Sequence, residues 1–170
     1  MTRKITGVLM AIVFFAACNN NNNSNTSLNG SDQQFLLQAS YSNQNEISAG
    51  HAAAVHGSVD SVRFFGQKMV TDHTTAQASL DSLASQFNVQ LPQSADSAHG
   101  VFFIQLQALS GNAFDTTYMA AQVRDHQSAV ALFQNEISNG NSQLIKNYVS
   151  QNLPVIQEHL QMAQSILSGL

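Results

Sequence analysis

The sequence predicts an all-α protein built around a four-helix bundle. Apolar side chains recur at steps of three and four residues over four long stretches, which is the spacing of one helix face. No stretch alternates apolar and polar residues in the way that a half-buried strand does. Only two prolines occur in 170 residues, so long helices can form without interruption.

The first two predicted helices form an antiparallel hairpin. The first is expected over residues 31–55, because the hydroxyl of Ser31 can cap the free amides of its first turn. Residues 56–58, with the sequence HGS, are typical of a helix stop followed by a new cap. The second helix is expected over residues 59–87, and a Leu-Pro pair soon after it breaks the pattern.

Three further helices complete the predicted fold. A shorter one is expected over 96–109 and a long one over 113–137. The last, over 142–167, should be kinked or restarted at Pro154, whose ring clashes with the preceding turn. The connection of about 25 residues between the second and third main helices is long enough for a crossover, as in ferritin-like bundles. We therefore expect a ferritin-like four-helix bundle with an extra short helix in that connection.

The chain begins with the pattern of an export signal. Arg3 and Lys4 precede an apolar stretch over 5–17, which is too short to span about 30 Å of hydrocarbon as a helix. The segment FAAC, which ends at Cys18, resembles a bacterial lipobox, in which the signal is cleaved before the cysteine and the sulfur is acylated. The alternative is an ordinary signal peptide with an incidental cysteine. We expect residues 1–18 to be a lipoprotein signal.

Residues 19–30 are expected to form a disordered tether. The segment opens with a run of asparagines, and almost none of its side chains can join a core. An acylated Cys18 would anchor the domain over 31–170 to a membrane, since each buried methylene contributes about 0.8 kcal/mol. The sequence thus predicts an exported, lipid-anchored protein of the cell envelope, with the outer membrane facing the periplasm as the expected location.

The composition excludes several classes of function. The formal net charge is -4 and only 9% of residues are charged, which argues against a nucleic-acid surface. The single cysteine rules out an intramolecular disulfide. The patterns Gly-x-Ser-x-Gly, His-Glu-x-x-His and a glycine-rich phosphate loop do not occur, so a hydrolase is poorly supported and an enzyme is the less expected class.

Two of the long helices share a polar signature. The segment VTDH at 70–73 is echoed by VRDH at 123–126, and both histidines fall on the apolar face of their helix. Unpaired polar groups at core positions are costly, which favours their meeting one another. A bundle would gather one such residue from each main helix: Glu46, His73, His126 and His159.

This polar set has two interpretations. Imidazole and carboxylate groups suit a transition metal such as Zn, Fe, Cu or Mn, with Asp72 and Asp125 as outer hydrogen-bond acceptors. The alternative is a polar core held by internal hydrogen bonds. Two observations weigh against a metal. A hairpin folded at Gly57 puts Glu46 and His73 about 7.5 Å apart along the axis, and the Glu-x-x-His motif of di-iron bundles is absent.

The remaining histidines are expected at the surface. His51 and His56 lie close to the first hairpin turn, where a solvated position is the simpler interpretation. His99 lies at the start of the short connecting helix, and a polar surface position is expected there too.

Several motifs resemble those of a known family in the same order along the chain. The motifs are SDQQFL at 31–36, FGQKMV followed by Asp72 and His73, YM at 118–119 with DH at 125–126, and LP at 153–154 with EHL at 158–160. They resemble bacterial proteins grouped as "domain of unknown function 4142". The resemblance covers about residues 31–167 and implies a ferritin-related helical bundle that is exported, often described only as an outer-membrane protein. It implies no activity, although Glu46, His73, His126 and His159 match polar positions of its pattern.

Two functions are therefore expected from the sequence. The first is a lipid-anchored envelope domain that acts as a binding or structural module, with an unidentified protein partner and a membrane contact through acylated Cys18. The alternative is a metal-binding or redox protein of the ferritin-like type with the Glu/His site in its core.

Overall fold

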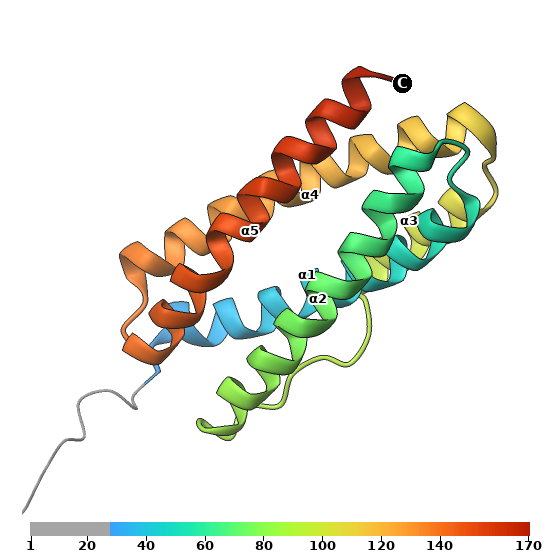
Figure 1. Cartoon of the computed structure of the whole chain (residues 1–170). Coiled ribbons are helices and arrows are strands. Elements are labelled where there is room, and N and C mark those ends of the chain that lie inside the picture. The colour runs from blue at the N-terminus through green and yellow to red at the C-terminus, as the bar shows by residue number, and fades with distance from the viewer. Residues whose placement is uncertain (1–27) are drawn as a thin grey trace, which may run out of the picture.

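The computed structural model describes residues 28–170, which form an all-α bundle (Figure 1). The expected signal, Cys18 and most of the expected tether lie outside the described residues. Within the described part, the predicted order of four long helices and one short one is confirmed: α1 (Gly30–His56), α2 (Asp60–Ser85), α3 (Ser97–Gln107), α4 (Gly111–Asn139) and α5 (Gln143–Ser168). None of these helices is long and apolar enough to cross a membrane.

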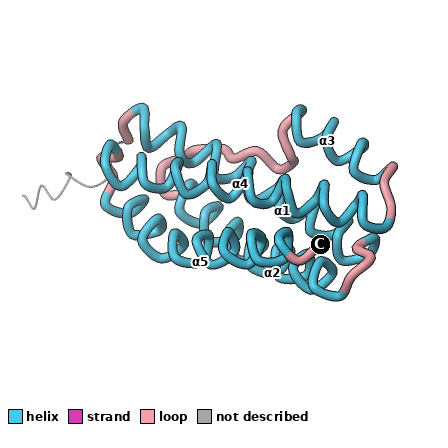
Figure 2. The backbone as a smooth tube through the Cα atoms, turned by 90° about the horizontal axis from the view of Figure 1, so that it is seen from above, coloured by secondary structure: helices cyan, strands magenta, loops and turns pink. Residues whose placement is uncertain are grey.

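The four long helices close into a bundle of two antiparallel hairpins. Helix α1 packs along α2 and α4 along α5, and contacts of α1 with α4 and of α2 with α5 join the hairpins. The short helix α3 contacts only α1 and α4 to a substantial extent, and Figure 2 shows it outside the bundle after the long loop that follows α2. The crossover predicted from the length of this connection is thus present, and α3 covers one seam of the bundle.

The start of α1 differs in detail from the prediction. Asn29, and not Ser31, caps the helix: its side chain accepts from the amide of Asp32, and the Asp32 carboxylate accepts from the amide of Asn29. Ser31 instead donates to Oε2 of Glu136 on α4, at 2.9 Å. The reciprocal pair of hydrogen bonds with Asp32 therefore starts the helix two residues before the predicted cap.

Of the two expected outcomes at Pro154, the restart does not occur, because α5 is one helix from Gln143 to Ser168. Pro154 lies on an exposed side of the helix, so the carbonyl of Ser150, which its ring deprives of a partner, is also at the solvent side. Water can satisfy that carbonyl there, which removes the main reason for the helix to restart.

Two glycines set the close spacing of α1 and α2. A Cβ atom on Gly66 would lie 2.7 Å from the amide nitrogen of Ala54 and from the carbonyl oxygen of Gly50. Because both obstacles are backbone atoms, no side-chain rotation relieves the clash. The glycine pair therefore fixes the register of the hairpin, which decides what lies opposite each polar residue of α1.

The apolar core is divided into two clusters by a polar layer. One cluster includes Phe35 and Phe133, whose rings meet edge to face at 5.0 Å, and the other includes Phe65 and Phe114. In each long helix, buried polar residues lie between the positions that contribute to the two clusters. The layer contains Asn43, Glu46, His73, Gln77, Gln122, His126 and His159. A polar layer in mid-bundle is where a built site is expected, since its groups must find partners away from water.

Candidate metal centre

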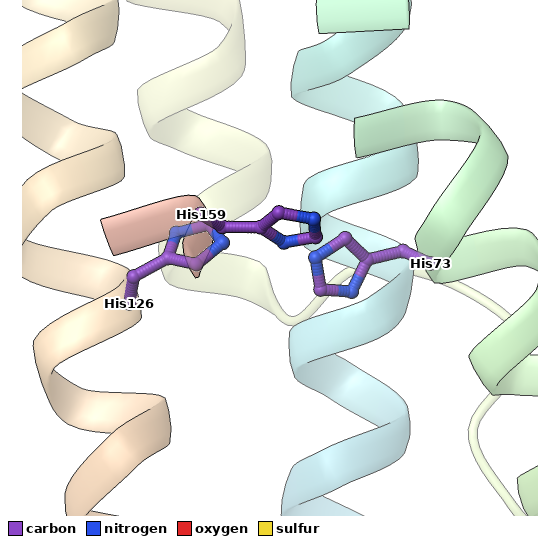
Figure 3. Close-up of side chains that lie close together, drawn as sticks. All are labelled: His73, His126 and His159. Carbon is purple, nitrogen blue, oxygen red and sulfur yellow. The ribbon is translucent and has the colours of Figure 1, made fainter. Parts of the chain in front are cut away.

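Three histidines from three different helices meet in the polar layer. His73 on α2, His126 on α4 and His159 on α5 point toward one another, as Figure 3 shows. Each supplies one ring nitrogen such that the three nitrogens lie within 4.8 Å of one another. The ring centroids are 5.4–5.8 Å apart, and the three residues are 1–6% exposed. We call these residues the three-histidine centre.

The tautomer of His73 is fixed by an asparagine of α1. Nδ1 of His73 lies 2.9 Å from Oδ1 of Asn43, while Nδ2 of Asn43 donates to Oε1 of Gln77 at 3.2 Å. Because the amide oxygen only accepts, Nδ1 of the imidazole carries the proton. Nε2 of His73 is left with its lone pair, and it has no hydrogen-bond partner among the described residues.

His126 and His159 are held in the same manner by other oxygens. Nδ1 of His126 donates to the main-chain carbonyl of Gln122 at 2.9 Å, and Nε2 of His159 donates to Oδ2 of Asp72 at 2.8 Å. The second nitrogens, Nε2 of His126 and Nδ1 of His159, have no partner within residues 28–170. Each ring therefore turns one bare lone pair inward while an oxygen acceptor holds its outer N–H. This is the arrangement of metal-binding histidines in proteins.

The surroundings keep all three imidazoles neutral. Burial lowers the pKa of His126 and of His159 to about 4, against weaker effects of Gln122 and Asp72 in the opposite direction. Burial, with the two neighbouring imidazoles, lowers the pKa of His73 well below its ordinary value. At neutral pH the inward nitrogens are therefore unprotonated, which is the form that binds a metal.

Glu46 lies beside the centre and not in it. Its Oε1 is 3.7 Å from Nδ1 of His126, the nitrogen that faces away from the other two rings and donates to the Gln122 carbonyl. Burial raises the pKa of Glu46 to about 8, so at neutral pH this contact joins a protonated carboxyl to a neutral imidazole and is not an ion pair. The structure thus brings together the three predicted histidines and places the fourth predicted residue behind one of them.

The hairpin register explains the position of Glu46. With Gly50 opposite Gly66, the residue of α1 at the level of His73 is Asn43, as their hydrogen bond confirms. Glu46 lies three residues further along α1, about 4.5 Å along the axis. An offset between Glu46 and His73 is therefore present, but it is smaller than the one of about 7.5 Å that the sequence predicted. Asn43, and not Glu46, lies at the level of His73 and binds it.

The two predicted outer aspartates have different neighbours. Asp72 accepts from His159 and also pairs with Lys68, whose Nζ is 3.0 Å from the same Oδ2. Burial would raise the pKa of Asp72, but hydrogen bonds from Lys68 and His159 together lower it, so the carboxylate is charged. Asp125 does not hold His126, whose outer nitrogen is taken by Gln122, and its Oδ2 lies 3.8 Å from Nε2 of His99.

His99 forms a separate cluster with two aspartates at the start of α3. Its Nδ1 lies 2.7 Å from Oδ2 of Asp96, and Asn45 on α1 donates to that same oxygen at 3.0 Å. We call Asp96, His99 and Asp125 the α3 junction. Asp125 and Asp96 raise the pKa of His99 to about 9 despite partial burial, so this imidazole is a cation. His51 and His56 are exposed, as predicted.

Apolar groups and one small cavity surround the centre. The ring of Phe65 lies edge-on at 6.3 Å from His126 and 6.5 Å from His159. A cavity of about 20 Å³ touches His73 and His159 on the seam between α2 and α5. The apolar ring of Phe65 lowers the local polarity on its side of the centre, which strengthens the electrostatic interactions of any bound ion.

Some of the residues that build the centre were not predicted from the sequence. Asn43, the Gln122 carbonyl and Lys68 each contact a predicted residue, yet none was singled out. Asn43 had a visible signal, since it lies three residues before Glu46 on the same face of α1. A main-chain carbonyl carries no side-chain signal at all.

Comparison with known proteins places the chain in a family. The family model described as "Domain of unknown function (DUF4142)" matches residues 18–166, so the chain belongs to this family and the resemblance seen in the sequence is confirmed. The chain is also similar to the crystal structure of a DUF305 fragment from Deinococcus radiodurans, with a TM-score of 0.74 and 10% identity. That match covers 84% of this chain and 99% of the fragment, and at this identity it shows a shared fold alone. No curated protein sequence matches the chain.

Proposed function

We propose that this DUF4142 protein binds one transition-metal ion at the three-histidine centre. A single observation carries the proposal: three buried imidazoles converge, and each has its outer N–H bound to an oxygen while its inner nitrogen has no partner in the described chain. Three unpartnered acceptor nitrogens that converge on one point favour a bound cation over a purely hydrogen-bonded core, since each is costly to bury alone.

The donor set favours particular ions. Three neutral nitrogens suit Zn, Cu and Fe, whereas Mn prefers oxygen ligands. In a tetrahedral site with metal–nitrogen distances of about 2.0–2.1 Å the ligand nitrogens lie about 3.4 Å apart. The nitrogens here lie within 4.8 Å, so side-chain movements of about 1 Å complete the geometry. Glu46 is the only carboxylate within the buried polar layer, so the described residues fit one ion and not a carboxylate-rich di-iron pair.

A three-ligand site leaves a coordination position to a small exogenous ligand. Zinc sites with three protein ligands bind water or substrate at the fourth position, in contrast to closed structural sites with four. The function proposed here is therefore that of a metal-binding or redox protein of the helical-bundle type.

A titration of the purified full-length protein with Co²⁺ tests the proposal. Bound Co²⁺ is expected to give visible absorption bands of a nitrogen-ligated ion at one equivalent, and Zn²⁺ should displace it. His126→Ala should abolish the bands, whereas His51→Ala, at an exposed histidine of α1, should not alter them. If wild type and His126→Ala give the same spectrum, the centre does not bind the metal.

Thermal unfolding gives an independent readout. An ion that binds only the native state at about 1,000 times its Kd stabilises it by about 4 kcal/mol. For a domain of this size we expect the Tm to rise by about 10 °C, at about 2–4 °C per kcal/mol. An unchanged Tm after addition of Zn²⁺, Cu²⁺, Fe²⁺ or Mn²⁺ to chelator-treated protein would contradict metal binding.

We further propose that the domain is carried on the cell envelope by a lipid on Cys18. The signal pattern before this cysteine and the short polar segment after it support an anchor and a spacer. Metabolic labelling with a palmitate analogue should mark the wild-type protein and leave Cys18→Ala unlabelled. Labelling of both proteins, or of neither, would rule out acylation at this cysteine.

A further inference from the structure

The three-histidine centre comes close to the protein surface along the seam between α2 and α5. The cavity of about 20 Å³ on this seam is lined by His73 and His159 of the centre and by Asp72 and Val155 nearer the outside. Val155 is 37% exposed. A space of this volume admits about one water-sized particle at a time. Two of the three rings of the centre therefore border this cavity, and an ion that enters it has to exchange water ligands for protein donors, because a fully hydrated ion does not fit.

A lysine lies across the outer end of this seam. Nζ of Lys68 on α2 is 3.0 Å from Oδ2 of Asp72 and 3.7 Å from Oε1 of Glu158 on α5. Its side chain is 25% exposed, so it is packed against the seam and not extended into solvent. The ammonium thus joins the two helices and occupies the carboxylates that an approaching cation would meet first.

We propose that the seam between α2 and α5 is the entrance for the metal ion and that Lys68 is the residue that restricts it. This inference rests on the proposed metal binding and concerns its rate and route. Asp72 and Glu158 supply the attraction for a divalent cation, and Asp72 also holds His159 in the binding tautomer. Lys68 neutralises part of that attraction, and an entering ion displaces its ammonium from Asp72. The lysine side chain is long and flexible, so this displacement needs no movement of a helix.

The larger cavity on the opposite face is a less suitable route. It has a volume of about 320 Å³ and is lined by Glu46, Gln122 and residues of α3, but by none of the three histidines. On that side His126 presents Nδ1, which already donates to the Gln122 carbonyl. An ion that entered there would reach Glu46 and Gln122 but no imidazole of the centre, whereas the cavity on the α2–α5 seam is bordered by two of the three.

Stopped-flow measurement of Co²⁺ binding to the full-length protein tests the route. Lys68→Met keeps the aliphatic stem and removes the charge, and we expect the association rate to rise about threefold to tenfold at low ionic strength, with a smaller gain at high salt. Lys146→Met is the matched control, since it removes a lysine charge from α5 about 20 Å along the helix from His159. It should leave the rate unchanged.

A steric variant and a variant of the opposite face complete the test. Val155→Phe adds bulk at the mouth of the seam and should slow association and dissociation by similar factors, with Kd nearly unchanged. Asp125→Asn changes a carboxylate that lines the larger cavity, and it should not affect the rate. Equal rates for wild type, Lys68→Met and Val155→Phe would overturn the entrance, as would a slower rate for Asp125→Asn alone. A wild-type protein that binds no Co²⁺ at all would instead refute the proposed metal binding.

Discussion

The three-histidine centre and the α3 junction use the same residue types and reach opposite charge states. In the centre, burial keeps three imidazoles neutral, and a charged carboxylate contacts only one of them. In the junction, Asp125 and Asp96 flank the half-exposed His99 and make it a cation. The difference arises because desolvation dominates in mid-bundle, whereas the charge of neighbouring groups dominates at the surface.

The repeated Asp-His pair shows how the two regions diverge. Asp72 and Asp125 precede histidines in equivalent sequence segments, and each carboxylate points away from its neighbouring ring because adjacent residues are about 100° apart around a helix. The Asp72 carboxylate on α2 therefore contacts His159 on α5, whereas the Asp125 carboxylate on α4 contacts His99 on α3. Whether the aspartate of an Asp-His pair contacts a histidine of the centre therefore depends on the neighbouring helix and not on the pair itself.

The largest expected effect is the loss of folding stability in acid, which we attribute to the histidines of the three-histidine centre. His126 and His159 have a folded-state pKa of about 4 against an ordinary value of 6.5, so the unfolded chain binds more protons between these values. The stability that they contribute is complete above about pH 6.5 and is lost as the pH falls through about 4, by about 3 kcal/mol for each imidazole. We expect the free-energy difference between the metal-free wild type and His126→Phe to change by about that amount between pH 7 and pH 4, in urea unfolding. A difference that is constant with pH would show that His126 is not buried in a neutral form.

Glu46 should give a pH dependence of the opposite sign. Its pKa is raised to about 8, so its contribution is complete below the ordinary value of 4.5 and is lost as the pH rises through 8. Glu46→Gln keeps the shape and cannot ionise, so its stability relative to wild type should grow by a few kcal/mol between pH 5 and pH 9. Glu158→Gln, at a carboxylate whose side chain is 61% exposed, is the control and should stay within about 0.5 kcal/mol of wild type. Parallel pH curves for wild type and Glu46→Gln would contradict the assigned burial of the carboxyl.

The two aspartates can be compared directly by matched substitutions. Asp72→Asn weakens the acceptor that orients His159 and should lower the affinity for Co²⁺ about 10-fold to 100-fold. Asp125→Asn makes the same chemical change one position before His126 and should alter the affinity by less than about twofold, because Gln122 already holds that ring. Competition with a chelator of known affinity measures both values. Equal losses would mean that the motif, and not the contact, determines the role of the aspartate.

The smallest effect is expected at the α3 junction. Because the folded-state pKa of His99 is raised to about 9, its contribution is complete below about pH 6.5 and is lost as the pH rises through 9. The side chain is 36% exposed, so solvent screening limits this contribution to about 1 kcal/mol. His99→Gln should lower stability at pH 6 by about that amount and increase amide exchange in α3, with no effect on Co²⁺ affinity. A loss of metal binding in this variant would contradict the separation of the α3 junction from the three-histidine centre.

The bundle itself could be predicted from local patterns. Helix order, the extra helix and the turns followed from apolar spacing and from glycine and asparagine clusters, since these depend on neighbours three or four residues apart. The continuation of α5 through Pro154 could not, because it depends on which side of the helix faces solvent. The three histidines were predicted to meet because His73 and His126 fell on the apolar face of their helices and His159 lay at the edge of its own.

The sequence by itself indicated the buried face of each long helix and that histidine and glutamate side chains would share a polar layer. Only the tertiary structure decided the heights and partners within that layer, through the glycine contact that sets Asn43 against His73 and leaves Glu46 behind His126. Periodicity specifies the direction of a side chain around its helix, whereas the relative shift of two helices is set by how their surfaces interlock. A site that requires atoms from three helices to meet within a few ångströms depends on that shift.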